Sequence, residues 1–100
     1  MQTLKFSIII ITWNGIRLLK EFLPSVIASE YADFEIIVAD NHSDDETVAW
    51  VQEYAPEVKV VELDRNYGYA GGNNRAAAAA TGDILLFLNN DVAVTKNWLA

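Results

Sequence analysis

The chain has 100 residues, of which 52% are hydrophobic and 21% are charged, and this composition fits one small folded domain rather than a disordered segment. The net charge is −7 and the seven basic residues are scattered singly, which argues against a nucleic-acid polymer as partner. A single nucleotide stays compatible, because one cation can neutralise both a diphosphate and an acidic pocket. No cysteine is present, so a disulfide framework and a thiolate metal site are excluded.

The first predicted strand is "FSIIII", residues 6–11. Its apolar stretch Ile8 to Ile11 is far shorter than the roughly 20 residues that a membrane-spanning helix needs. No small-residue cleavage site follows, so the run does not resemble a signal peptide. We therefore expect a cytoplasmic protein, with membrane association of a full-length form left open.

Three helical segments alternate with three further apolar runs. Residues 16–29 carry an amphipathic stripe, with Pro24 inside it, and residues 44–55 form the next helical segment. The last connection, residues 70–82, is glycine-rich at first and then continues into a helix on the alanine run Ala76 to Ala80. The other strands are "FEIIVA" (34–39), "VKVVEL" (58–63) and "DILLFL" (83–88). Continuous apolar runs are typical of parallel strands covered on both faces. The βαβαβαβ series predicts an α/β fold, a Rossmann-like doubly wound parallel sheet of about four strands.

A polar group of residues follows each predicted strand. These groups are Thr12 to Gly15, Asp40 to Ser43, Asp64 to Gly68 and Asn89 to Asp91. In open α/β sheets, ligands bind outside the carboxyl ends of the strands. One such group would be an ordinary turn, but four at one edge predict a binding site.

Several of these residues have two interpretations. Asp40 caps the loop that follows it, or accepts hydrogen bonds from a base or ribose. Trp13 stacks on a planar ligand, or covers the edge of the sheet. Ser43, Asp44 and Asp45 are expected to cap a helix, and His42 to lie in a surface turn.

The stretch "NYGYAGGNN", residues 66–74, places Gly68, Gly71 and Gly72 just before the predicted helix. Glycines there allow close backbone approach and leave helix N-terminal amides facing an anion. Their spacing matches neither the dinucleotide fingerprint nor the Walker loop. At the last strand end, Asp91 with the nearby amide oxygens of Asn89 and Asn90 fits a Mg²⁺ or Mn²⁺ site, because such cations are often held by one carboxylate plus phosphates; the alternative is an ordinary turn.

The stretches "SIIIITWNG", "IIVADNHSDDET", "RNYGYAGGNNRA" and "TGDILLFLNNDVAVTKNWL" together resemble the family 2 glycosyltransferases of the GT-A fold, and among them the rhamnosyltransferase-like members. The resemblance covers nearly the whole chain, with all four motifs in order. It implies a metal-assisted transferase that moves a sugar from a nucleotide-diphosphate sugar to an acceptor hydroxyl with inversion. It implies a nucleotide pocket formed by Thr12, Trp13, Asn14, Asp40, Asn41, Asn66, Gly68, Gly71, Gly72, Asn74 and Asn90. Metal ligands would be Asp91 and Asn89, where Asn89 replaces the usual first aspartate of D-x-D.

The family places its catalytic base and acceptor pocket beyond the metal motif, whereas this chain ends nine residues after Asp91. We therefore expect residues 1–100 to be the N-terminal, nucleotide-sugar-binding half of a GT-A domain, binding donor without transferring sugar. The exposed apolar faces of such a half are expected to favour self-association. The family suggests polysaccharide synthesis, with saccharide or lipid-linked acceptors.

Two other functions are compatible with an α/β sheet. A flavodoxin-like or receiver-like signalling domain would need an acidic cluster after the first strand and a lysine at a late strand end. Here the first strand ends in Thr12-Trp13-Asn14, and Lys96 follows the last predicted strand at a distance. A packing module without a ligand would not need four polar strand ends.

Overall fold

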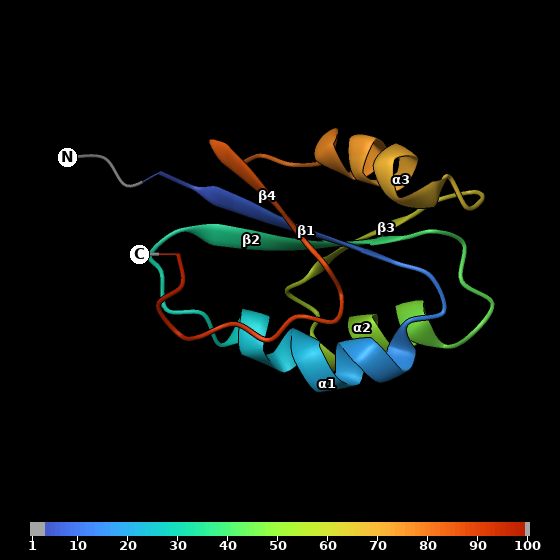
Figure 1. Cartoon of the computed structure of the whole chain (residues 1–100), viewed down its shortest axis with the longest axis horizontal. Helices are drawn as coiled ribbons and strands as arrows, with labels where there is room; N and C mark the ends of the chain where they lie inside the picture. The colour runs from blue at the N-terminus through green and yellow to red at the C-terminus, as the bar shows by residue number, and fades with distance from the viewer. Residues whose placement is uncertain (1–3, 100) are drawn as a thin grey trace.

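Four parallel strands form one sheet in the computed structural model, which describes residues 4–99. The strands are β1 Phe6–Thr12, β2 Phe34–Asp40, β3 Lys59–Glu62 and β4 Ile84–Leu88, in the order β3-β2-β1-β4. The helices are α1 Ile16–Ile27, α2 Thr47–Tyr54 and α3 Gly68–Ala77. Helices α1 and α2 cover one face of the sheet and α3 covers the other (Figure 1). The predicted doubly wound parallel sheet is confirmed.

Side chains of β1 alternate between two cores, one on each face of the sheet. Ile8 and Ile10 pack with α1 and α2, whereas Ile9 and Ile11 pack with Ala76 of α3. Because β1 lies between β2 and β4 and is covered on both faces, nearly all of it is buried. This explains the uninterrupted apolar run in the sequence. None of the helices within residues 4–99 is both long and apolar enough to cross a membrane.

The segment after β4 returns along α1. The backbone N–H of Val94 donates to Ser25 Oγ at 3.1 Å, and the indole N–H of Trp98 donates to Ser29 Oγ at 2.7 Å. Leu99 is buried in the core that α1 shares with the sheet. The turn that carries Asp91 is therefore fixed on both sides, by β4 before it and by the contacts with α1 after it (Figure 1).

Helix α3 differs from the prediction, which placed a glycine-rich loop first and the helix on the alanine run Ala76 to Ala80. It begins at Gly68, so Gly71, Gly72 and Asn74 lie within the helix rather than in a loop before it, and it ends at Ala77, inside the alanine run. The cause is close packing. A Cβ at position 72 would lie 2.4 Å from Ile11 Cδ1 and 2.9 Å from Asn41 Nδ2, so only glycine lets the helix lie this near the sheet. Tertiary packing here overrides the poor helix propensity of glycine.

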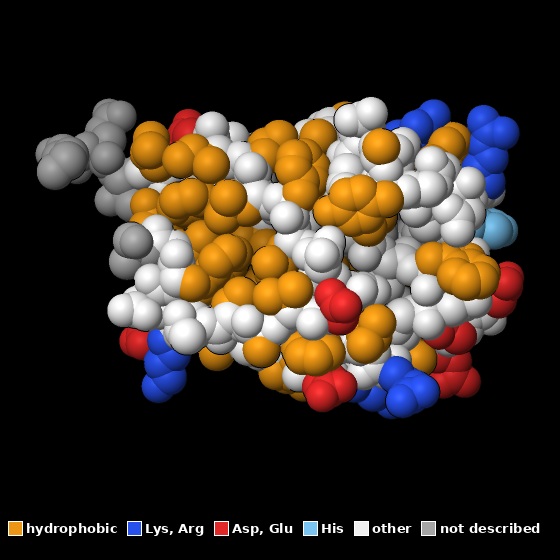
Figure 2. Space-filling view, in the orientation of Figure 1, with side chains coloured by type: hydrophobic (Ala, Val, Ile, Leu, Met, Phe, Trp, Pro, Cys, Tyr) orange, Lys and Arg blue, Asp and Glu red, His pale blue; other side chains and the backbone are white. Residues whose placement is uncertain are grey.

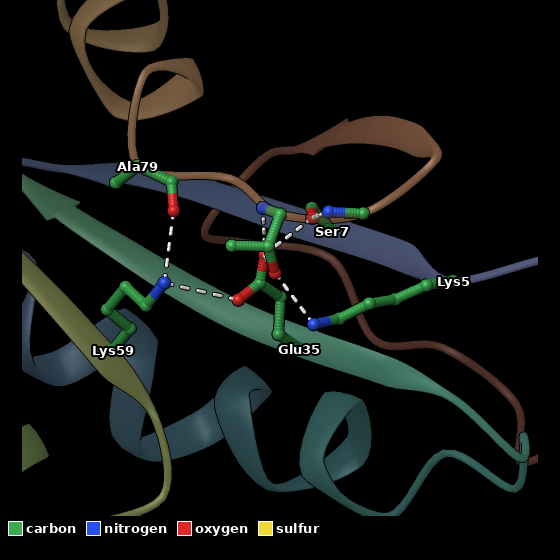
Figure 3. Close-up of polar contacts among 7 residues, drawn as sticks. Lys5, Ser7, Glu35, Lys59 and Ala79 are labelled. Atoms are coloured by element: carbon green, nitrogen blue, oxygen red, sulfur yellow. Dashed lines mark hydrogen bonds and ion pairs between the residues drawn. The ribbon is translucent and has the colours of Figure 1, made fainter.

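A cluster of polar side chains that bond to one another lies at the amino ends of the strands (Figure 3). Glu35 of β2 accepts hydrogen bonds from Ser7 Oγ at 2.6 Å and from the backbone N–H of Thr81 at 2.7 Å, and pairs with Lys59 Nζ at 3.3 Å. Burial by itself raises the pKa of Glu35, but these hydrogen bonds outweigh it and lower the pKa from 4.5 to about 2. We call Lys5, Ser7, Glu35, Lys59 and Thr81 the Glu35 cluster. It ties β1, β2 and β3 to the loop between α3 and β4.

Candidate functional site at the carboxyl ends of the strands

The strand order reverses between β1 and β4, because β2 and β3 lie on one side of β1 and β4 lies on the other. Thr12, 2% exposed, ends β1, and its Oγ1 accepts a hydrogen bond from Asn90 Nδ2 at 3.2 Å across this point. A Cβ at position 15 would lie 2.1 Å from Thr12 Oγ1 and 2.9 Å from Asn90 Nδ2. Gly15 is therefore required for Thr12 and Asn90 to meet. Ligands of open α/β sheets bind at such a reversal.

Asn14 joins the turn after β1 to the loop after β2. It adopts a left-handed backbone, with φ of 47°, which asparagine tolerates better than most residues. Its N–H donates to Ser43 Oγ at 2.8 Å, and its side-chain oxygen accepts from the N–H of Asp44 at 2.7 Å. The side-chain oxygen of Asn14, a predicted nucleotide-binding residue, is thus used to hold the loop after β2.

Asp40, 3% exposed, fixes the same loop from β2. One carboxylate oxygen accepts from the N–H of Ser43 at 2.9 Å, and the other accepts from Ser43 Oγ at 2.5 Å. These bonds match the loop-capping interpretation of Asp40, and its contact with a nucleotide stays a prediction. They also correct the expectation for Ser43, which caps no helix. Asp45 is not the N-cap residue of α2, which is Glu46, but its carboxylate accepts from the N–H of Thr47, the first residue of the helix, at 3.0 Å.

Beside Asp40 lies a hollow of about 400 Å³ between the loop after β2, helix α2 and the end of β3. It is lined by Asp40, His42, Ser43, Asp45, Val48, Ala49, Gln52, Glu62 and Leu63. His42 is exposed in the loop with φ of 66°, as expected of a turn residue. Three carboxylates make this hollow unsuited to a phosphate, although carboxylates can accept hydrogen bonds from N–H or O–H groups.

Asn41 connects β2 to the start of α3. Its side-chain oxygen accepts from the N–H of Tyr67 at 3.0 Å, and its side-chain nitrogen donates to the carbonyl oxygen of Gly68 at 3.0 Å. The side chain is 4% exposed. Both ends of this amide therefore hold the loop before α3, and the contact of Asn41 with base or ribose stays a prediction.

The loop between β3 and α3 is capped by Asn66, whose side-chain oxygen accepts from the N–H of Gly68 at 2.8 Å. Gly68 has φ of 76°, a conformation that favours glycine. The guanidinium groups of Arg65 and Arg75 lie 4.8 and 3.5 Å from the centre of the Tyr67 ring. Asn74 is exposed on α3. Both guanidinium groups therefore lie close to Tyr67 before α3, Arg65 from the loop and Arg75 from the last turn of the helix.

The end of β4 carries the groups that remain accessible. Asp91 and Asn89 are exposed, and Tyr69 Oη of α3 donates to Asn89 Oδ1 at 3.3 Å. Trp13 is 52% exposed after β1. No group of three histidine or acidic side chains within residues 4–99 forms a ready metal site. A single carboxylate with amide oxygens beside it nevertheless suits Mg²⁺ or Mn²⁺, which use few protein ligands when phosphates supply others. The donor set thus fits the predicted metal.

Sequence reasoning gave no individual role to three residues of this region. Tyr69 contacts Asn89, and Gly15 allows Thr12 and Asn90 to meet. Asn73 of α3 is 7% exposed, and its side-chain oxygen is buried without a partner among residues 4–99. Only Gly15 had a signal in the sequence, since it follows Asn14 in a turn after a strand. We call Thr12 to Gly15, Asp40 to Ser43, Tyr67 to Tyr69 and Asn89 to Asp91 the strand-end site.

Comparison with known proteins relates this arrangement to a family. Residues 7–100 match the model of glycosyl transferase family 2. An uncharacterized glycosyltransferase of Nostoc is 35% identical over 91 residues, which cover 88% of this chain and 28% of that protein. The poly(ribitol-phosphate) β-N-acetylglucosaminyltransferase TarS of Staphylococcus aureus is 33% identical over 96% of this chain and 18% of TarS. The chain thus spans less than a third of the length of these two relatives.

Solved structures show the same likeness in three dimensions. The crystal structure of TarS residues 1–349 in complex with UDP matches with a TM-score of 0.86 and 33% identity, over 95% of this chain and 30% of that one. The mannosyltransferase of Pyrobaculum calidifontis in complex with GDP-Man and Mn²⁺ matches with a TM-score of 0.84 and 27% identity. That match covers 93% of this chain and 29% of the mannosyltransferase.

Proposed function

The chain belongs to glycosyl transferase family 2, and from that premise we propose that its strand-end site binds the nucleotide diphosphate of a sugar donor. The observation that carries the proposal is the convergence of four polar strand ends around the reversal between β1 and β4, with Asp91 and Trp13 left accessible. An aromatic face suits a nucleobase, and a carboxylate suits a cation that accompanies phosphates.

The residues of the site divide into two kinds in this proposal. Asn14, Asp40 and Asn41 use their side chains to fix the loops around the site. Trp13, Asn89, Asn90 and Asp91 have groups left for a ligand. The base therefore stacks on Trp13, and the diphosphate lies toward the end of β4. A divalent cation held by Asp91 would offset the negative charge that builds on the diphosphate as it leaves.

We extend the proposal to the reaction of a longer protein that contains this chain. An acceptor hydroxyl oxygen bonds to the anomeric carbon while the bond to the diphosphate oxygen breaks, and the hydroxyl proton passes to a general base. Attack opposite the leaving group inverts the anomeric centre. The base and the acceptor site, for a saccharide or a lipid-linked sugar, are assigned to segments outside residues 1–100. The chain alone then binds donor and transfers nothing.

The relatives support a nucleotide-diphosphate donor but differ in its identity. One structure holds UDP and the other holds GDP-Man with Mn²⁺. The rhamnosyltransferase-like specificity predicted from Asn89 stays a prediction.

The test is a titration of the isotope-labelled chain with UDP, dTDP and GDP, each with and without Mg²⁺, followed by amide chemical shifts. We expect shifts at Trp13 and at Asn89 to Asp91, and a dependence on Mg²⁺ that disappears in Asp91→Ala. Glu57→Ala, which changes an exposed carboxylate outside the site, is the matched control. A folded chain whose spectrum ignores every nucleotide would overturn the proposal.

Self-association is a further proposal about the isolated chain. Leu85 and Phe87 of β4 are 38% and 48% exposed, and β4 is an edge strand of the described sheet. Hydrophobic side chains gather on the face that contains β4 (Figure 2). An apolar edge strand is a template for pairing with a second copy. We expect sedimentation to show dimers at high concentration and a shift toward monomer in Phe87→Lys; a wild-type monomer throughout would contradict this.

A further inference from the structure

Two arginine side chains meet on one aromatic ring at the start of α3. The guanidinium carbon of Arg75 lies 3.5 Å from the centre of the Tyr67 ring, and that of Arg65 lies 4.8 Å from it. Arg75 belongs to the last turn of α3, but its Nη1 donates to the carbonyl oxygen of Gly71 at 3.2 Å, so its side chain lies back toward the start of the helix. Basic side chains gather at the corner of the molecule where α3 begins (Figure 2).

The ring that carries the two guanidinium groups is held in place. The N–H of Tyr67 donates to Asn41 Oδ1 at 3.0 Å, and its hydroxyl donates to a carboxylate oxygen of Asp64. Asn41, directly after β2, is itself buried. The ring is therefore attached to the end of the sheet through its backbone and to the preceding loop through its hydroxyl, and it fixes where both guanidinium groups lie.

Within residues 4–99, neither arginine forms an ion pair with a carboxylate, whereas Lys59 at the opposite edge is paired with Glu35. The carboxylate of Asp64 is occupied by the Tyr67 hydroxyl, which is the largest cause that lowers its pKa, and the charges of the two arginines add to that effect. Two positive charges thus share one ring beside a single carboxylate, although the net charge of the chain is −7. The local charge is positive and suits an anion.

The guanidinium groups have hydrogen-bond donors left for such an anion. A guanidinium carries five N–H donors in one plane. Arg75 uses one of them on Gly71, both arginines are exposed, and stacking on a ring occupies the face of the group rather than its N–H edges. A planar fork of N–H groups matches the oxygens of a phosphate, which it binds with two parallel hydrogen bonds.

We propose that Arg65 and Arg75 form a binding site for a phosphate monoester or diester group of a second ligand, bound together with the nucleotide and separate from it. Arg65 follows β3, and β3 and β4 are the two outer strands of the sheet. The cation and the diphosphate proposed above lie toward β4 instead. Tyr67 is the positioning residue of this second site, because both guanidinium groups stack on its ring.

The test is a titration of the isotope-labelled chain with inorganic phosphate at constant ionic strength, followed by amide and guanidinium N–H shifts. We expect shifts at Arg65, Tyr67 and Arg75. Arg65→Ala and Arg75→Ala should each weaken phosphate binding about tenfold, as the loss of one charge-assisted contact predicts. Arg17→Ala removes an exposed arginine of α1, and this control should change the affinity by less than about twofold. Unchanged shifts elsewhere in each spectrum show that the variant is folded.

Arg75→Lys and Asp64→Asn distinguish a built site from a positive surface. Lysine keeps the charge but lacks the planar fork, so phosphate affinity should fall about fivefold in Arg75→Lys. Asp64→Asn removes the negative charge beside the arginines and should raise the affinity about twofold. Equal phosphate affinities in wild type and Arg75→Lys would overturn the proposal, because attraction by charge alone would then explain the binding.

A second phosphate titration, at saturating UDP, separates this inference from the proposed function. We expect the shifts at Arg65 and Arg75 to persist, because the two ligands occupy different places. Loss of these shifts when UDP is bound would assign the arginines to the nucleotide and overturn the proposal. If UDP does not bind but phosphate shifts both arginines, the proposed function fails and this inference stands. If phosphate shifts neither arginine, this inference fails whatever UDP does.

Discussion

The Glu35 cluster and the strand-end site are polar regions at opposite edges of one sheet, and they use their hydrogen-bonding groups differently. In the Glu35 cluster the groups bond to each other: Glu35 accepts from Ser7 and Thr81, and Ser7 Oγ in turn accepts from the N–H of Gly82 at 2.8 Å. At the strand-end site, Asp91 is exposed and the amides of Asn89 and Asn90 each have one end bonded.

The comparison teaches that polarity alone does not mark a binding site. Buried polar groups that satisfy each other stabilise the fold, and groups with remaining bonding capacity at an accessible edge are available to a ligand. Some residues of the strand-end site belong to the first kind. Asp40 and Asn41 fix loops, as Glu35 fixes the opposite edge. Each prediction below tests this division.

The largest effect is expected from Glu35→Gln. Its pKa of about 2, against an ordinary 4.5, corresponds to about 3 kcal/mol of stability at pH 7. Glutamine resembles the protonated carboxyl, so the variant should lose about that free energy of unfolding, measured by urea denaturation. UDP affinity of the folded variant should not change. A change in affinity without a loss of stability would break the comparison.

The same shift predicts the pH dependence of the wild-type chain. Because the pKa of Glu35 is lowered in the folded state, its contribution is fully present above the unfolded value of 4.5 and is lost as the pH falls toward 2. The difference in unfolding free energy between wild type and Glu35→Gln should therefore shrink across this window. A constant difference from pH 7 to pH 2 would contradict the lowered pKa.

Gly15→Ala should affect both stability and binding. The new Cβ would lie 2.1 Å from Thr12 Oγ1, so Thr12 and Asn90 must separate, at a cost of about 2 kcal/mol. Chemical denaturation measures the stability, and the UDP titration measures the site. Gly68→Ala is the comparison variant, because a Cβ at position 68 has no atom within 4 Å and its strain comes from φ alone. An unchanged UDP titration in Gly15→Ala would argue that the contact between Thr12 and Asn90 does not shape the site.

Asn41→Ala should cost about 1.5 kcal/mol of stability, because it leaves the N–H of Tyr67 and the carbonyl of Gly68 without their partner. The exposed Asn74→Ala is the matched control on α3. If Asn41 contacted a base instead of fixing the loop, binding would weaken and stability would hardly change.

The smallest effect is expected from Trp13→Ala. The ring is half exposed, so stability should change little, whereas UDP affinity should fall about fivefold if the base stacks on it. Trp13→Phe keeps an aromatic face and should recover most of the affinity. Equal UDP affinities in wild type and Trp13→Ala would show that Trp13 does not stack on the base and would support the alternative, in which it only covers the edge of the sheet.

The sequence predicted the fold well because the physical signal was local. Continuous apolar runs such as Ile8 to Ile11 and Ile36 to Ala39 are buried strands. The start of α3 was mispredicted, because Gly71 and Gly72 are poor helix formers whose place in a helix depends on contact with the sheet and Tyr67. Such contact lies outside any local window of sequence.

For the site, the sequence predicted the residues better than their contacts. It placed polar residues at the four strand ends, because the ends of parallel strands share an edge. It could not predict that Ser43 bonds to Asp40 and Asn14, or that Tyr69 bonds to Asn89. These partners come together only through the tertiary fold, and the nucleotide and metal roles of the residues stay predictions.

The pairing of the first strand with the last has a consequence for synthesis of the chain. β1 pairs with β2 in register from Phe6 and Phe34 onward, whereas its other neighbour begins with Ile84 opposite Phe6. A nascent chain on the ribosome can therefore assemble β1, β2 and β3 before β4 has emerged. Until then Thr12 lacks Asn90, and an apolar side of β1 stays open to other chains or chaperones. Ligand in the cell can meet a completed site only after the last strand has inserted.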